Sequence, residues 1–306
     1  MTLEQLRIFV AVAERQHVTQ AAQSLNLAQS AASHAVAALE ARYDTKLFNR
    51  VGRRIELTEI GAVFLAEARA ILAQVNRAEV ALSEFGTMER GTLTIQASQT
   101  IAGYWLPRHL VAFRGAHPRI DVQLTIGNTA RVADAIETGV AELGFVEGVV
   151  DKEELVSTRV ALDQLVLVVG NEHPWAGGAM PTVDDLRDAE WVMRERGSGT
   201  RSVFEQVLRS HGVQPGELRV SLELPSNEAV RAAVEAGMGA TALSASVAAA
   251  SIENGLLAHV PLSLPQREFH VLHHRQRHLS RVAGVLLATF DRPGRSHAES
   301  KPSFAR

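Results

Sequence analysis

Two short alanine-rich segments, joined without proline or glycine, constrain the fold of this chain more than any other feature. They make up TQAAQSLNLAQSAASHAVAALE, residues 19–40, and Asn26 and Leu27 lie between them. Asn26 can take the left-handed conformation that ends a helix, and alanines let two helices cross closely. The pattern therefore predicts two tightly joined short helices, the second over about residues 30–42, after a first helix over about residues 3–15.

The second short helix has a polar start. Gln29, Ser30, Ser33 and His34 cluster there, and the apolar side chains of the helix share another face: Ala32, Val36 and Leu39. A projecting helix of this kind fits the DNA major groove, where amide, hydroxyl and imidazole groups bond to base edges. The pattern favours a helix-turn-helix, with an ordinary helical hairpin as the alternative. Thr19 is expected to cap the first of the two helices.

A basic hairpin is expected to follow. KLFNRVGRRIELT, residues 46–58, is typical of two short strands, 46–48 and 55–57, around a basic tip. Arginines at such a tip can reach phosphates or an adjacent minor groove, and here they are Arg50, Arg53 and Arg54. Without this context, the basic patch fits a solvated loop equally well.

A long helix is predicted next, because no glycine or proline lies between Gly61 and Gly86. Its apolar residues alternate at spacings of four and three, as in the seam of a coiled coil: Phe64, Ala68, Ile71, Val75, Ala78, Leu82 and Phe85. A stripe this narrow favours pairing with a second copy of the chain into a dimer. Packing of the stripe on its own domain is the alternative.

Alternating strand and helix patterns fill the chain from Thr92 onward. The clearest predicted strands are residues 92–97, 120–126, 142–146 and 164–170. Repeated strand-helix units predict an α/β domain with mostly parallel sheets and helices on both faces. About 200 residues of this pattern can form two subdomains, and the cleft between subdomains is a usual place for a small ligand.

Composition excludes several classes of protein. The chain has 306 residues and 46% apolar content, enough for packed cores, and it has no cysteine, which excludes a disulfide framework and a thiol nucleophile. Charged residues interrupt its early apolar stretch, so neither a signal peptide nor a membrane span is expected and the cytoplasm is the expected compartment. The net charge of −3 gives no hint of nucleic acid, in contrast to the local patch.

Residues 194–208, RERGSGTRSVFEQVL, are the segment richest in binding chemistry. Gly197 and Gly199 allow backbone N–H groups to approach a ligand, Ser198 and Thr200 add hydroxyls, and a helix starting near Thr200 points its positive end at the same place. We predict a small anionic ligand here, with a capped loop as the alternative. Two more loops between a strand and a helix carry similar donors: Ser98, Gln99 and Thr100, and then Asn128 and Thr129.

A metal or catalytic site is not predicted. Four histidines lie close in sequence, at positions 270, 273, 274 and 278, but alternation along the strand pattern EFHVLHH points them to opposite faces, and carboxylate or cysteine partners are not expected nearby. Gly197, Ser198 and Gly199 lack the spacing of a nucleophile elbow. No cofactor is expected, and the tail from about residue 291 is expected to be disordered.

These residues together give the chain a resemblance to the LysR-type transcriptional regulators over essentially its full length. The resemblance is carried by LRIFVAVAE, TQAAQSLNLAQSAASHAVAALE, LFNRVGRRIELTEIG, YWLPRHLVAF, HPRIDVQL, DQLVLVVGNEHP and GSGTR. It implies a winged helix-turn-helix that binds double-stranded promoter DNA, a dimerising linker helix and a ligand-sensing domain shaped like a periplasmic binding protein. Such proteins commonly assemble as homotetramers.

The resemblance also implies domain bounds and site residues. The bounds are 1–58, 59–90 and 91–306, with subdomain I at 91–161 and 266–292 and subdomain II at 162–265. The implied DNA contacts are Thr19, Gln29, Ser30, Ser33, His34, Arg50, Arg53 and Arg54. The implied effector contacts are Ser98, Gln99, Thr100, Asn128, Thr129, Ser198, Gly199, Thr200 and Arg201.

The sequence departs from the family at two positions. Ala28 stands where a serine or threonine is common, so Ser30 is expected to cap the recognition helix one turn later, and Asp44 stands where glycine is common. The chain is therefore interpreted as a ligand-responsive regulator rather than an enzyme. A solute-binding protein or enzyme with an incidental helical front end, and an architectural DNA binder that ignores ligands, are the competing interpretations.

Overall fold

A computed structural model describes residues 1–51, 54–84, 91–148 and 150–290. The chain divides near residue 87 into two compact units, which are described separately below. Within the described ranges, every helix is too short or too polar to cross a membrane. The predicted disordered tail lies outside the described residues.

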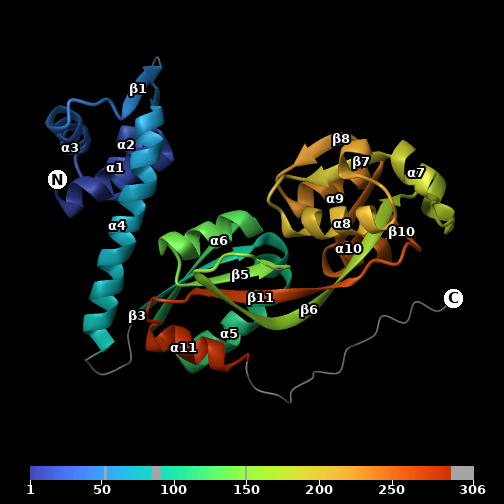
Figure 1. The fold of residues 1–306 in the computed structure, drawn as a ribbon. Coiled ribbons are helices and arrows are strands. Elements are labelled where there is room, and N and C mark those ends of the chain that lie inside the picture. The colour runs from blue at the N-terminus through green and yellow to red at the C-terminus, as the bar shows by residue number, and fades with distance from the viewer. Residues whose placement is uncertain (52–53, 85–90, 149, 291–306) are drawn as a thin grey trace. The chain divides into compact units, whose positions relative to one another are not determined.

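The described residues of the N-terminal unit form four helices and a hairpin (Figure 1). Its elements, in chain order, are α1 (Leu3–Arg15), α2 (Val18–Ser24), α3 (Gln29–Arg42), β1 (Phe48–Val51), β2 (Arg54–Leu57) and α4 (Glu59–Glu84). The predicted first helix, the tightly joined pair and the long helix are confirmed. The hairpin strands extend nearer to the tip than predicted, because β1 and β2 pair from Phe48 with Leu57 to Val51 with Arg54.

The turns of this unit rely on left-handed residues other than glycine. Asn26 has φ 56° between α2 and α3, and Asp44 has φ 47° after α3, as expected for these residue types. Gln16 also has a positive φ of 49°. It ends α1, and the next helix begins only two residues later, at Val18.

Both predicted caps are wrong. The residue that caps α2 is His17, whose Nδ1 accepts the N–H of Gln20 at 3.4 Å, and Thr19 lies exposed inside the helix. In α3, helical geometry already begins at Gln29, so Ser30 stands within the first turn and cannot be the N-cap.

The first half of the long helix α4 packs against the core of its own unit. Phe64 lies 4.7 Å from Phe9 between ring centroids, and Ala68 is fully buried in the same core. Farther along, Ile71 is exposed. The first part of the predicted seam therefore follows the alternative of packing within its own domain, and Phe85 lies outside the described residues.

The C-terminal unit begins with three strands alternating with helices (Figure 1). These elements are β3 (Gly91–Ser98), the π-helical turn η1 (Ile101–Trp105), α5 (Leu106–Ala116), β4 (Ile120–Gly127), α6 (Thr129–Thr138) and β5 (Leu143–Glu147). A long strand, β6 (Leu155–Gly170), then leads into the second half of the unit.

The second half repeats the pattern before the chain returns to the first. Its elements are η2 (Pro174–Gly177), α7 (Val183–Asp188), β7 (Glu190–Arg194), α8 (Gly199–Ser210), η3 (Pro215–Glu217), β8 (Arg219–Leu224), α9 (Asn227–Glu235), β9 (Ala240–Ser244), α10 (Ala245–Glu253) and β10 (Leu257–Val260). The return is made by β11 (Gln266–His274) and α11 (Arg281–Ala288).

The strands form a mixed sheet, so the prediction of mostly parallel sheets is wrong. The strand order is β4-β3-β5-β11-β6-β9-β7-β8, and β10 also pairs with β6. Among the described strands, β3 pairs in parallel with β4 and β5, and β7 pairs in parallel with β8 and β9. The two strands that pass between the halves, β6 and β11, run antiparallel to each other and to their other neighbours.

Each half has its own cores, with helices on both faces of the strands as predicted. In subdomain I, the half with β3, β4 and β5, helices α5 and α11 pack on one face and α6 on the other. In subdomain II, the half with β7, β8 and β9, α7 and α8 pack on one face and α9 and α10 on the other. Trp191 is the largest fully buried side chain of subdomain II.

Candidate functional site

The start of α3 presents polar side chains to solvent. Gln29, Ser30 and His34 are exposed and Ser33 is half-buried, and the side-chain amide of Gln29 donates to Ser33 Oγ at 2.9 Å. The cluster predicted from the sequence is therefore contiguous on the surface of one helix.

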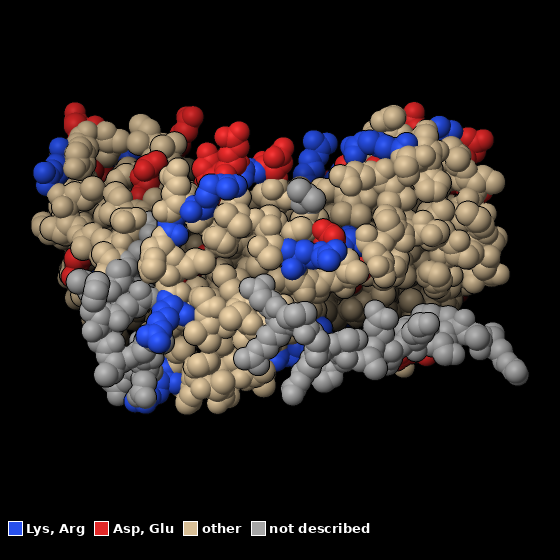
Figure 2. Space-filling model, turned by 60° about the horizontal axis from the view of Figure 1, so that its bottom comes forward, with Lys and Arg blue, Asp and Glu red and all other residues tan. Residues whose placement is uncertain are grey.

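The predicted tip arginines are only partly covered by the structure. The backbones of Arg50 and Arg54 belong to β1 and β2, and Arg53 lies outside the described residues. In the face shown in Figure 2, acidic and basic side chains are interspersed and much of the surface carries neither. The net charge of −3 likewise provides no overall attraction to DNA.

Glu40 holds the hairpin against α3. One carboxylate oxygen accepts the backbone N–H groups of Leu47 and Phe48 at 2.9 and 3.2 Å, and the other accepts from Lys46 Nζ at 2.8 Å. Burial alone would raise the pKa of Glu40, but these hydrogen bonds outweigh burial and hold the pKa below its usual value. The charged carboxylate thus fixes where the hairpin leaves the helix.

Replacing Glu40 with alanine is expected to speed amide exchange at Leu47 and Phe48 by roughly tenfold, because each N–H loses a charge-assisted bond. Since the folded pKa of Glu40 is lowered, its protection is complete above the unfolded pKa and is lost as pH falls through the folded pKa. Hydrogen exchange followed by mass spectrometry measures both effects. Glu56→Ala, on an exposed residue of the same hairpin, is the control and should leave exchange unchanged.

A buried arginine joins the two subdomains of the C-terminal unit. Arg267, on β11, pairs through Nε with Asp163 of β6 at 2.7 Å, and Ser244 donates to the same carboxylate at 2.7 Å. Its Nη1 donates to Thr200 Oγ1 at 2.9 Å, and its Nη2 donates to Thr100 Oγ1 at 3.5 Å. One guanidinium therefore contacts predicted effector residues from both subdomains.

A second set of contacts links the 98–100 loop to the start of α9. The side chain of Gln99 accepts the N–H of Asn227 at 2.9 Å and donates to Pro225 O at 2.6 Å. Asn227 in turn donates its side-chain amide to Thr100 Oγ1 at 3.0 Å. Ser98 Oγ is buried and, among the described residues, has no hydrogen-bond partner.

The other predicted loops meet directly. Ala130 N–H donates to Gly197 O at 3.3 Å, and the Asn128 amide donates to Glu195 at 3.2 Å. Burial alone would raise the pKa of Glu195, but the hydrogen bond and charge of Arg194 outweigh it and lower the pKa. The subdomains are therefore also in contact through the 128–130 loop and residues 195–197.

Two residues of the 197–201 segment have different surroundings. Gly199 packs so closely that a Cβ atom would stand 2.7 Å from both Glu147 O and Thr129 Oγ1. Arg201 bonds to Glu205 at 2.7 Å and to the Arg194 carbonyl oxygen at 2.9 Å, both within subdomain II. The structure thus brings Gly199 to the junction of the subdomains and engages Arg201 elsewhere.

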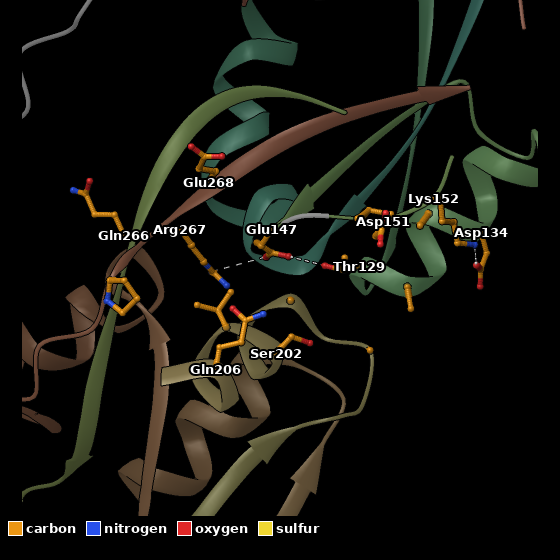
Figure 3. A pocket seen from close by; sticks show the side chains of 18 residues that line it. Thr129, Asp134, Glu147, Asp151, Lys152, Ser202, Gln206, Gln266, Arg267 and Glu268 are labelled. Carbon is orange, nitrogen blue, oxygen red and sulfur yellow. Dashed lines mark hydrogen bonds and ion pairs between the residues drawn. The ribbon is translucent and has the colours of Figure 1, made fainter. Parts of the chain in front are cut away.

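A cavity of about 490 Å³ opens beside these contacts (Figure 3). It is lined from subdomain I by residues within 129–134, by Glu147 and Gly148 and by residues 150–152. From α8 it is lined by Gly199, Ser202 and Gln206, and from β11 by Arg267 and its neighbours. The cavity thus lies where both subdomains and one of the connecting strands meet.

One histidine of the cluster, His270, belongs to a hydrogen-bonded chain on the strands that connect the subdomains. His270 bonds to Ser157 Oγ at 2.9 Å through Nδ1 and to Glu268 at 3.1 Å through Nε2. The expectation that no carboxylate lies nearby is therefore wrong, because residues two apart on a strand share a face. Among the described residues, no three potential ligands gather in a way that could hold a metal ion.

Comparison with known proteins identifies both units. Residues 3–62 match the bacterial regulatory helix-turn-helix protein family of the lysR type, and residues 86–292 match the LysR substrate binding domain. The chain belongs to the LysR family. It is therefore a DNA-binding transcriptional regulator with an effector-binding domain, and, as expected, its family and relatives are regulators rather than enzymes.

Individual relatives of this LysR-family protein agree over most of its length. The HTH-type transcriptional regulator YeiE of Escherichia coli (strain K12) is 35% identical over 282 residues, which are 92% of this chain and 94% of YeiE. Full-length CbnR, solved with its target DNA, has a TM-score of 0.68 at 24% identity, covering 95% of this chain and 99% of CbnR. The predicted fold class is confirmed by these matches.

The regulatory domain has a further structural relative. The CcmR regulatory domain of Synechocystis PCC6803, solved in complex with 2-PG, has a TM-score of 0.59 at 27% identity. The match covers 66% of this chain and 98% of that domain.

Sequence reasoning about this LysR-family chain missed the charged residues at the junction. Arg267 is in phase with buried Phe269 on β11, and Asp163 is in phase with buried Leu165 and Leu167 on β6. A charged residue on the buried face of a strand demands a partner. That period-two signal was present in the sequence and could have identified both members of the pair.

Proposed function

We propose that this regulator binds promoter DNA through α3 and the β1–β2 hairpin and responds to a small anionic effector held between its two subdomains. The observation that carries the proposal is the position of Arg267, whose guanidinium contacts Thr100 of subdomain I and Thr200 of subdomain II. A cation with hydroxyl groups on either side is suited to bind an anion.

The DNA half of the proposal assigns base contacts to Gln29, Ser30, Ser33 and His34, and backbone contacts to Thr19 and the tip arginines. Exposure of the α3 cluster supports the assignment, since side chains that read base edges must project into the groove. That CbnR has been solved with its target DNA also supports it. We further propose that the chain forms a homodimer through α4 and that dimers assemble into a homotetramer. The proposed domain bounds are 1–58, 59–90 and 91–306.

The effector half assigns ligand contacts to the three loops around Arg267. The assigned residues are Ser98, Gln99, Thr100, Asn128, Thr129, Ser198, Gly199, Thr200 and Arg201. Support comes from the buried Ser98 hydroxyl, whose hydrogen-bonding capacity is not used by any partner among the described residues. The small ligand bound to the CcmR regulatory domain gives independent support for a ligand on this unit.

Effector binding would favour one arrangement of the subdomains and so alter how paired helix-turn-helix units engage DNA. Effector and DNA affinities must then be reciprocally coupled. Calorimetry of the full chain against sulfate, phosphate and a set of carboxylates tests the effector half. We expect one or more anions to bind, and Thr100→Ala and Thr200→Ala to weaken binding by about tenfold each.

Unchanged anion affinity in both variants would reject these assignments. Footprinting upstream of the protein's own gene, with and without the bound anion, tests the coupling. A saturating anion that leaves both DNA affinity and bending unchanged would show that the protein is a constitutive DNA binder.

A further inference from the structure

A buried carboxylate forms part of the wall of the cavity (Figure 3). Glu147 ends β5, and its side chain is only 3% exposed. Its contacts are long: the Thr129 hydroxyl donates to one oxygen at 3.3 Å, and Arg267 Nη2 lies 4.0 Å from the other. Arg267 makes its close ion pair with Asp163 instead, at 2.7 Å.

The charges of this cluster do not balance. Glu147 and Asp163 are two carboxylates, and Arg267 is, within the described part of the chain, the one cation that reaches both. Because a buried charge is costly unless it is paired, the excess carboxylate favours a positively charged group in the space beside it. The adjacent space is the cavity that Glu147 itself lines.

Groups that attract an anion lie close to the same carboxylate. Gly199 begins α8 and lines the cavity, and the N–H groups of the first turn of a helix have no partner within the helix. The N-cap residue Ser198 makes no side-chain capping bond among the described residues. The Nη2 atom of Arg267 has the longest contacts of the guanidinium, 3.5 and 4.0 Å, so it can accept an additional anion.

We propose that the cavity binds a small zwitterion of the α-amino-acid class. The ammonium group pairs with Glu147, and the carboxylate binds at the start of α8 beside Arg267. These poles lie near one another, because a Cβ on Gly199 would stand 3.0 Å from Glu147 Cβ. The cavity, about 490 Å³, leaves room for a side chain toward Ser202 and Gln206.

This inference rests on the proposed effector site and narrows the class of its ligand from an anion to a compound with both charges. Calorimetry of the full-length protein with each standard L-amino acid is the first experiment. At least one amino acid is expected to bind. Its decarboxylated amine and its deaminated acid should each bind about tenfold more weakly or worse, since each loses one charged contact.

Two results of this ligand series would overturn the inference. If the deaminated acid binds as tightly as the amino acid, the ammonium is not recognised, and the proposed anionic effector stands without this refinement. If no amino acid binds while sulfate or another simple anion does, the zwitterion is again excluded and the proposed function survives.

Variants of Glu147 provide the second experiment. Glu147→Gln keeps the shape and removes the charge, so it should lower amino-acid affinity about tenfold or more, whereas Glu147→Asp should retain part of it. The control Glu172→Gln, on an exposed turn residue, should bind as the parent does.

Unchanged or tighter amino-acid binding by Glu147→Gln would overturn the proposal. Circular dichroism establishes whether Glu147→Gln is folded. If it is not folded, Glu147→Asp and the ligand series decide the question. Equal affinity of the folded parent for the amino acid and for its deaminated acid contradicts the inference without any variant.

Discussion

Replacing Arg267 with methionine is expected to destabilise the C-terminal unit by about 3–5 kcal/mol, because Asp163 is left buried without a countercharge. The pair is 2.7 Å apart, with side chains 1% and 7% exposed. The Ser244 hydroxyl still donates to Asp163 but supplies no positive charge. Urea unfolding followed by tryptophan fluorescence measures the change, since the three tryptophans all lie in this unit: Trp105, Trp175 and Trp191.

The matched control is Arg159→Met, because Arg159 also pairs with a carboxylate across β6 and β11. Arg159 lies 3.1 Å from Glu268, but the side chains are 62% and 41% exposed, so this change should cost less than about 1 kcal/mol. Adding Asp163→Asn to Arg267→Met should recover part of the loss. Equal urea midpoints for the two arginine variants would contradict the assigned role of the buried pair.

Replacing both Gln29 and His34 with alanine is expected to weaken specific DNA binding by roughly 100-fold or more, because each side chain that pairs with a base edge contributes about 1–3 kcal/mol of discrimination. Binding to an unrelated duplex should change little, since phosphate contacts supply most of that affinity. Fluorescence anisotropy with a duplex from upstream of the protein's own gene, at fixed salt, measures both quantities.

The control for this experiment is His117→Ala, which removes a histidine from the C-terminal unit and should leave DNA affinity as it is. A Gln29→Ala, His34→Ala double variant that discriminates between the two duplexes as well as the parent would contradict the base-reading role of α3. A loss that is equal for both duplexes would move these residues from base recognition to backbone contact.

Local patterns predicted the N-terminal unit well. Helical spacing of apolar residues placed α1 correctly, and the tolerance of Asn26 for left-handed geometry predicted the turn between α2 and α3. The starts of α2 and α3 were predicted less well. Left-handed Gln16 and an imidazole cap at His17 are uncommon solutions, so preferences for hydroxyl caps pointed to the wrong residues.

The interior of the C-terminal unit could be predicted only in part. Hydrophobic patterns located β3, β4, β5 and the second half of β6, but nothing local to residues 155–170 or 266–274 showed that they pair antiparallel with each other. The same long-range pairing brings Arg267 to Asp163, which is 104 positions earlier in the chain. The sequence therefore indicated the loops that meet at this junction but not the charged residues between them.

The two antiparallel strands that run between the subdomains limit how those subdomains can move. A paired ribbon resists sliding, because every hydrogen bond along it fixes the register, whereas it yields readily to torsion. The register of β11 against β6 shifts between Phe269 and His270, two residues beyond Arg267. This irregular point of the ribbon lies close to the guanidinium, so we expect a ligand bound there to act by twisting the ribbon rather than by sliding one strand along the other.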